Sequence, residues 1–178
     1  MKVPCREIDE KMPKKVALIN PPFLPNYSRG QRSPAVTRSG TLYYPIWLAY
    51  AACHVIRLGH EPFLLDAPAM NLGWKESLER IREWKPHLVL VETATPSIEN
   101  DLSFAREAKK TASGAKVFVC GTHVSALPEE TLSETPELDG VVVGEYEIPL
   151  QEILETELKG RPFNGLEGVL SRGEKNRP

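Results

Sequence analysis

Small and polar residues that could bind a ligand follow four of the apolar runs in this sequence. Glycines among them let a backbone approach a ligand closely, and hydroxyl groups donate hydrogen bonds. No nucleophile beside a base, no carboxylate pair and no metal-ligand cluster accompanies them, so we assign no catalytic or metal-ligating residue. The pattern favours binding of a large polar cofactor. We predict these cofactor-binding residues: Pro21, Pro22, Phe23, Thr93, Thr95, Ser97, Gly121, Thr122, His123, Gly144 and Glu145.

Predicted strands and helices alternate along the chain, and they must position these residues. Short apolar runs have the composition of buried strands, and helical segments separate them. This alternation predicts an α/β fold, an open parallel sheet of about five strands with helices on both faces. Loops at the carboxyl ends of such strands meet at one edge, where ligands bind. The expected strands are 15–20, 60–66, 87–92, 116–120 and 138–143, and the expected long helices are 45–59, 74–84, 97–111 and 145–158.

The chain is long enough for one medium domain with a real core. We expect residues 1–14 to be a disordered or extended lead-in and residues 15–160 to form the domain. Residues 161–178 are expected to hold an edge strand near 166–170 and the start of a linker.

Three local expectations concern burial. The helix at 45–59 is apolar nearly all round, which predicts that it is heavily buried. Cys53, in that helix, and Cys120, at a strand end, are expected to be packed thiols. The long loop at 21–43 is expected to be irregular, and its arginines, Arg29, Arg32 and Arg38, to be solvated.

Composition excludes some partners. The formal net charge is −2, which gives no reason to expect nucleic acid or an anionic membrane as the main partner. No run approaches the roughly 18 apolar residues of a membrane span, and the first residues are polar. We therefore expect no membrane span and a cytoplasmic protein.

The sequence lacks the motifs of several common ligand-binding α/β folds. The first strand is followed by Asn20-Pro21-Pro22-Phe23 instead of a dinucleotide-binding glycine motif, and the sequence holds no Walker motif. The acidic residues and lysine of a phosphoacceptor domain are also missing from the predicted strand ends. Asn20-Pro21-Pro22-Phe23 does match a motif of amino methyltransferases, which stays open as an alternative. A non-catalytic flavodoxin-like interaction domain, with an edge filled by its own side chains, is the other alternative.

Taken together, five segments resemble the cobalamin-binding domain at the amino terminus of cobalamin-dependent radical S-adenosylmethionine enzymes. The strand and turn at 117–130 and the segment at 139–153 are the most specific part of the resemblance. The matching segments are VALINPPF (16–23), YPIWLAYAACHVIRLGHEPFLLDA (44–67), LVLVETATPS (88–97), VFVCGTHVSALPEE (117–130) and DGVVVGEYEIPLQEI (139–153).

The resemblance implies a flavodoxin-like sheet with cobalamin lying across its carboxyl edge and its nucleotide tail reaching between sheet and helices. It implies that the candidate residues named above line the corrin or the tail, and that Gly121 lets the backbone approach the tail. The Asp-x-His-x-x-Gly motif that places a histidine on cobalt in other cobalamin domains does not occur. The expected cofactor is therefore base-off cobalamin without a protein histidine ligand.

The resemblance also limits what this chain does by itself. The cysteine motif that holds a four-iron cluster in the radical domain is missing from the sequence. We expect an excised amino-terminal module of a longer enzyme. The resemblance implies that its partner is a carboxyl-terminal radical domain, which binds S-adenosylmethionine and the cluster. The implied activity of the whole enzyme is methyl transfer.

Overall fold

A six-stranded sheet forms the centre of the computed structural model, which describes residues 12–30 and 34–172. The sheet order is β4-β1-β5-β6-β7-β8, in which the first five strands are parallel and β8 is antiparallel to β7. This order of the parallel strands is that of flavodoxin-like folds, as predicted. The strands are β1 (Lys15–Asn20), β4 (Glu61–Asp66), β5 (Leu88–Thr93), β6 (Lys116–Gly121), β7 (Gly140–Val142) and β8 (Val169–Ser171).

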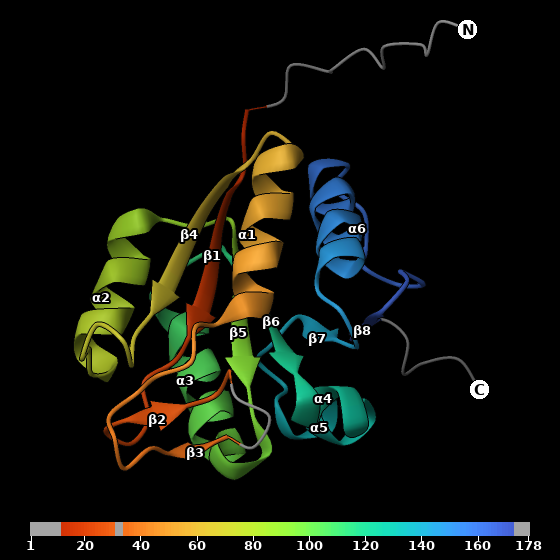
Figure 1. The fold of residues 1–178 in the computed structure, drawn as a ribbon. Coiled ribbons are helices and arrows are strands. Elements are labelled where there is room, and N and C mark those ends of the chain that lie inside the picture. Colours follow the sequence, from red (N-terminus) through yellow and green to blue (C-terminus); the bar gives the residue numbers. More distant parts are fainter. Residues whose placement is uncertain (1–11, 31–33, 173–178) are drawn as a thin grey trace, which may run out of the picture.

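Helices cover both faces of the sheet (Figure 1). One face is covered by α1 (Ile46–Arg57) and α6 (Glu147–Leu158), whose apolar side chains join one core cluster. The other is covered mainly by α2 (Trp74–Trp84) and α3 (Ile98–Thr111). A 3₁₀ turn, η1 (Thr95–Ser97), precedes α3, and two short helices, α4 (Thr122–Ala126) and α5 (Pro128–Glu134), follow β6. Alternate residues of each central strand face the two clusters, which is why these strands read as continuous apolar runs.

The expectation that the 45–59 helix is heavily buried was wrong. Leu48, Ala51 and Val55 are buried, but Ile46, Trp47, Tyr50 and Ile56 are exposed. The helix packs on the sheet along one stripe, and its other face is apolar yet open. Cys53 lies on that open side and is exposed, so only the prediction of a packed thiol at Cys120 is confirmed.

The loop after β1 is more ordered than expected. It contains an antiparallel pair of two-residue strands, β2 (Tyr27–Ser28) and β3 (Ala35–Val36), which lies at the carboxyl edge of the sheet (Figure 1). Arg38 is exposed as predicted, whereas Arg32 lies outside the described residues. Arg29 was expected to be solvated, and this was wrong because its side chain enters the protein to meet Asp101.

The Arg29–Asp101 ion pair fastens this loop to the rest of the fold. The guanidinium binds both carboxylate oxygens of Asp101, and the side chains are 1% and 0% exposed. Arg29 also donates to the side-chain oxygen of Asn20 and to the carbonyl oxygen of Pro21. Asp101 additionally accepts from the Ser97 hydroxyl at 2.6 Å. One buried arginine therefore ties the ends of β1 and β5 to the start of α3.

None of the described helices is long and apolar enough to cross a membrane.

We predict that Arg29→Ala lowers the free energy of unfolding by about 3–5 kcal/mol, because it leaves the Asp101 carboxylate buried without its counter-charge. Urea denaturation followed by circular dichroism measures the change. Arg38→Ala, an exposed arginine of the same loop, is the control and should change stability by less than about 0.5 kcal/mol. A double variant, Arg29→Met with Asp101→Leu, should be more stable than Arg29→Ala. Equal stability of Arg29→Ala and wild type would contradict the prediction that the buried Arg29–Asp101 ion pair stabilises the fold.

Candidate functional site

Two adjoining cavities open at the carboxyl edge of the sheet. Their volumes are about 630 Å³ and about 540 Å³, and both are lined by Trp47, Gly121, Thr122 and Tyr146. The larger cavity is also lined by Arg29, Gly30, Pro34, Ile46, Glu92, Thr93, Ala94, Thr95 and Pro96, and the smaller by Ser125, Ala126, Gly144 and Glu145. The loops after β5, β6 and β7 thus meet the start of α1 around one hollow region.

The structure brings part of the predicted set to these cavities. The residues that line them are Thr93, Thr95, Gly121, Thr122, Gly144 and Glu145. Phe23 lies elsewhere, at a smaller cavity of about 310 Å³ that it shares with Thr95 and Ser97. A ring nitrogen of His123 lies 3.4 Å from the Thr95 hydroxyl, outside the lining of both larger cavities.

Three predicted residues serve mainly to hold the loops in place. The carbonyl oxygen of Pro21 accepts from Arg29, and that of Pro22 accepts from the Asn100 side chain at 2.9 Å. Ser97 is buried, and its hydroxyl donates to Asp101 at 2.6 Å. None of these three residues lines either of the two larger cavities.

Glycine is required at positions 121 and 144 for different physical reasons. At Gly121 φ is +116°, and a Cβ atom would lie 2.2 Å from the carbonyl oxygen of Thr93. The Thr93 hydroxyl also donates to the carbonyl oxygen of Cys120 at 2.8 Å, so the ends of β5 and β6 are packed closely. At Gly144 φ is +81°, but a Cβ atom would meet nothing within 4 Å. Gly121 is thus required by the fold, and Gly144 only by its backbone conformation.

The lining residues that the sequence prediction missed include three with large or titratable side chains: Trp47, Glu92 and Tyr146. Trp47 was assigned to a buried helix, yet it is exposed beside both cavities. Glu92 is an acidic residue in an otherwise apolar strand, which was the signal available for it. Tyr146 directly precedes α6, and its hydroxyl donates to Glu92 Oε1 at 3.1 Å.

Glu92 is the unusual titratable group of the site. Burial raises the pKa of its carboxyl from 4.5 to about 7, although the Tyr146 hydrogen bond and the charge of Arg29 lower it. Burial also raises the pKa of the neighbouring Cys120 thiol and of the Tyr146 hydroxyl. Near neutral pH the carboxyl therefore exchanges a proton readily, while the thiol and the phenol keep theirs.

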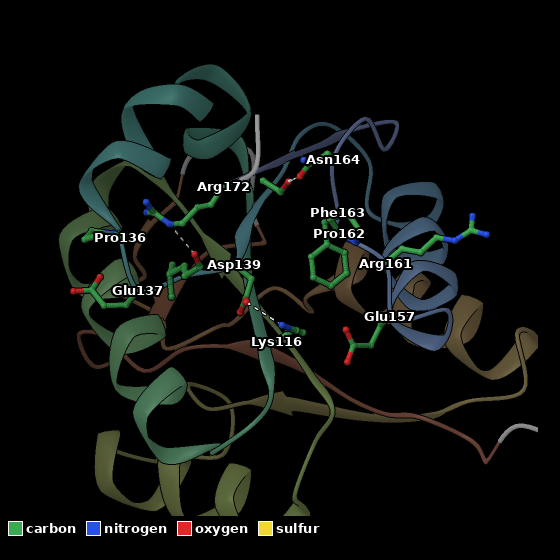
Figure 2. A pocket seen from close by; sticks show the side chains of 13 residues that line it. Lys116, Pro136, Glu137, Asp139, Glu157, Arg161, Pro162, Phe163, Asn164 and Arg172 are labelled. Atoms are coloured by element: carbon green, nitrogen blue, oxygen red, sulfur yellow. Dashed lines mark hydrogen bonds and ion pairs between the residues drawn. The ribbon is translucent and has the colours of Figure 1, made fainter. Parts of the chain in front are cut away.

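A third cavity, of about 610 Å³, lies at the amino ends of β6 and β7 (Figure 2). Several of its charged residues have partners: Asp139 pairs with Lys109 at 2.6 Å and with Lys116 at 3.6 Å, and Glu137 pairs with Arg106 at 3.6 Å. Arg172 donates to the carbonyl oxygens of Leu132, Thr135 and Leu138. These contacts connect the start of β7 to β6 and α3, and the end of β8 to the segment before β7, so we assign these residues a structural role.

Known proteins resemble this chain over most of its length. Residues 32–154 match the family described as the B12 binding domain. A methyltransferase of Pyrococcus horikoshii, itself uncharacterized, is 31% identical over 130 residues, which are 73% of this chain and 28% of that protein.

Solved structures show the same fold. The radical S-adenosylmethionine methyltransferase TsrM from Kitasatospora setae, with tryptophan substrate and an S-adenosylmethionine analogue bound, superposes with a TM-score of 0.72 at 21% identity, over 91% of this chain and 29% of that chain. A second TsrM structure, with cobalamin and a [4Fe-4S] cluster bound, gives a TM-score of 0.67 at 22% identity, over 92% and 28%. The chain thus spans less than a third of these relatives.

We predict that Gly121→Ala is far more destabilising than Gly144→Ala. The first adds a clash with backbone to a positive φ and should lower the free energy of unfolding by at least about 3 kcal/mol, whereas the second should lower it by about 1–2 kcal/mol. Paired urea denaturation curves measure both. Similar losses in the two variants would contradict the close approach of β5 and β6.

We also predict that Glu92 makes stability depend on pH. Its pKa is higher in the folded than in the unfolded chain, so the folded state binds the proton more tightly, and stability from this group falls as pH rises from 4.5 to about 7. The loss is about 3 kcal/mol and is complete above that range. Glu92→Gln should therefore gain stability relative to wild type as pH rises through this window, in urea melts at both ends of it. A constant difference between the two proteins would contradict the prediction.

Proposed function

This chain belongs to the B12-binding domain family, and on that premise we propose that it holds cobalamin across the carboxyl edge of its sheet. The observation that carries the proposal is the pair of adjoining cavities at that edge, floored by Gly121 and open beside Thr122. A large cofactor needs such an open region, with glycine backbone at its floor and polar groups around it.

The residues that line the two cavities have the chemistry needed to bind cobalamin. Trp47 offers an exposed aromatic surface beside both cavities, and the exposed Thr122 offers a hydroxyl. Glu92 Oε2 is buried without a hydrogen-bond partner within residues 12–30 and 34–172, and Glu92 lines the larger cavity. A polar ligand bound in the cavity would offer a hydrogen-bond partner to this side chain.

We propose that cobalamin is held base-off and without a histidine from the protein on cobalt. None of the four histidines lines either cavity at the carboxyl edge. His60 and His87 accept backbone hydrogen bonds from Lys14 and Lys15 at the other end of the sheet. His54 contacts the Gln151 side chain at 3.3 Å, and His123 contacts Thr95. No group of three His, Cys, Asp or Glu in the described part of the chain could itself hold a metal ion.

The longer relatives suggest the setting in which the module works. We propose that it is part of a radical S-adenosylmethionine methyltransferase, in which S-adenosylmethionine and a four-iron cluster bind outside the residues of this chain. Bound cobalamin would supply a cobalt centre able to carry a methyl group. Trp47, Thr122 and Glu92 of this chain would bind and orient the cofactor.

The amino methyltransferase alternative is disfavoured by the state of Asn20. Its side-chain nitrogen donates to Asp66 at 2.8 Å, and its oxygen accepts from Arg29 at 2.9 Å. The residue is 3% exposed, so its amide is occupied by the fold rather than presented to an amine. The alternative of a non-catalytic interaction domain expects an edge filled by its own side chains, whereas this edge is hollow.

We predict that the purified chain binds hydroxocobalamin saturably and gives a base-off absorption spectrum. Thr122→Trp should weaken binding at least tenfold, because the indole fills space between the two cavities. Arg80→Trp, an exposed position on α2, is the matched control and should bind like wild type.

Equal binding by Thr122→Trp and wild type would place the site elsewhere. Failure of wild type to bind at cobalamin concentrations of roughly 100 μM would contradict the proposed function for this chain. Binding of S-adenosylmethionine by the chain alone, lost in Asn20→Ala, would favour the amino methyltransferase instead.

A further inference from the structure

Glu92 has one satisfied and one unsatisfied oxygen. It is the fifth residue of β5, a strand buried along its whole length, and it is 6% exposed. Oε1 accepts the hydrogen bond from Tyr146. Oε2 is buried and finds no partner among the residues that the structure describes. Because buried polar atoms in folded proteins are almost always paired, an unpaired carboxyl oxygen on a residue that lines a cavity points to a ligand group that completes it.

The surroundings favour the uncharged form of this carboxyl. The titratable and charged groups that act on it are Cys120 on β6, Tyr146 before α6, Arg29 in the loop after β1, Asp66 on β4 and Asp101 on α3. Arg29 is the one cation among them, and Asp101 already binds it through two hydrogen bonds. The nearby carboxylates of Asp66 and Asp101 repel a further negative charge. Glu92 therefore lacks a counter-ion of its own.

In an uncharged carboxyl group one oxygen is a carbonyl oxygen, which accepts hydrogen bonds, and the other carries a proton, which it can donate. Because Oε1 already accepts from Tyr146, we place the proton of the uncharged carboxyl on Oε2 and assign Oε1 as its carbonyl oxygen. Oε2 is then a hydrogen-bond donor and needs an acceptor. With a pKa of about 7, about half of the Glu92 carboxyls carry this proton at pH 7, and more of them carry it below that pH.

We propose that Glu92 is a positioning residue that donates a hydrogen bond from Oε2 to an uncharged acceptor on the nucleotide tail of bound cobalamin. This inference rests on the proposed function. The benzimidazole nitrogen that base-off binding frees from cobalt is the strongest such acceptor, because its lone pair is no longer coordinated. The larger cavity, at about 630 Å³, has the volume of a site for a drug-sized group, so it takes an arm of the cofactor rather than the whole corrin.

Binding should then depend on pH. Above about pH 7 the Glu92 carboxyl of the ligand-free protein ionises, and a carboxylate offers a lone pair, not a proton, to the acceptor. Binding must then take up a proton, so affinity falls by up to tenfold for each further pH unit. Removing the Tyr146 hydroxyl should move this fall to higher pH, because its hydrogen bond lowers the pKa of Glu92.

The test compares methylcobalamin with methylcobinamide, which keeps the corrin and lacks the nucleotide tail. Dissociation constants are measured in the dark by absorbance and by calorimetry between about pH 6 and about pH 9, a range in which neither ligand titrates. The proteins are wild type, Glu92→Gln, Glu92→Leu and Tyr146→Phe, each checked for its fold by circular dichroism. Glu92→Gln keeps a donor and an acceptor at the same places but has no acidic proton.

Wild type should bind methylcobalamin more weakly as pH rises above about 7, with proton uptake in calorimetry. Glu92→Gln should bind it at all pH values without that fall, Glu92→Leu should bind roughly tenfold more weakly at pH 6, and Tyr146→Phe should show the fall at higher pH. Methylcobinamide should bind all four proteins alike and without pH dependence.

Two results would overturn the inference while leaving the proposed function intact. Equal pH dependence with methylcobinamide would place Glu92 on the corrin instead of the tail. Binding of methylcobalamin by every variant with the affinity of wild type at all pH values would leave Glu92 a role in the fold alone. If wild type binds neither ligand, the proposed function itself fails, and the inference that rests on it fails too.

Discussion

The buried ion pair between Arg29 and Asp101 is the interaction on which the carboxyl edge depends. Arg29 comes from the loop after β1, and Asp101 lies in the first turns of α3. Asn20 connects the same pair to the end of β1, and the backbone N–H of Ala94, which follows β5, donates to Asp101 at 3.2 Å. Arg29, Gly30 and Pro34 form one wall of the larger cavity, so the position of that wall is fixed by a charge pair in the interior. A buried pair of this kind makes its loop geometry specific because no other partner can replace it at low energy.

The cavities of the molecule differ more in whether their polar groups have hydrogen-bond partners than in their volumes. The cavity at the amino edge is about as large as those at the carboxyl edge, but Asp139, Lys116 and Arg172 in its lining are bound to other groups of the fold. At the carboxyl edge Glu92 keeps an unpaired oxygen, and Thr122 is exposed. A fold satisfies its own polar groups where they serve structure, so an unsatisfied group is the more informative sign of a ligand.

The site combines rigid and adaptable parts. Gly121 is held between β5 and β6 by backbone contacts, and Glu92 lies within a buried strand. Gly144, Glu145 and Trp47 lie at the surface around the opening. A rigid floor fixes how deep a ligand enters, while exposed groups at the opening can adjust to it or to a neighbouring domain. The exposed apolar face of α1 is part of the same surface, and the relatives that share this fold are several times longer than the chain.

The sequence by itself determined the class of fold and the edge at which we propose that a ligand binds. Apolar runs alternating with helical segments are local patterns, and parallel strands bring the loops after Asn20, Thr93 and Gly121 together whatever the details of packing. Only the tertiary structure decided which loop residues face a cavity and which hold the loops. Arg29, expected in solvent, is buried because Asp101, 72 positions along the chain, supplies its counter-charge. Trp47, expected in the core, is exposed because α1 buries one stripe, and Glu92 was missed because its burial depends on strands and helices distant in sequence.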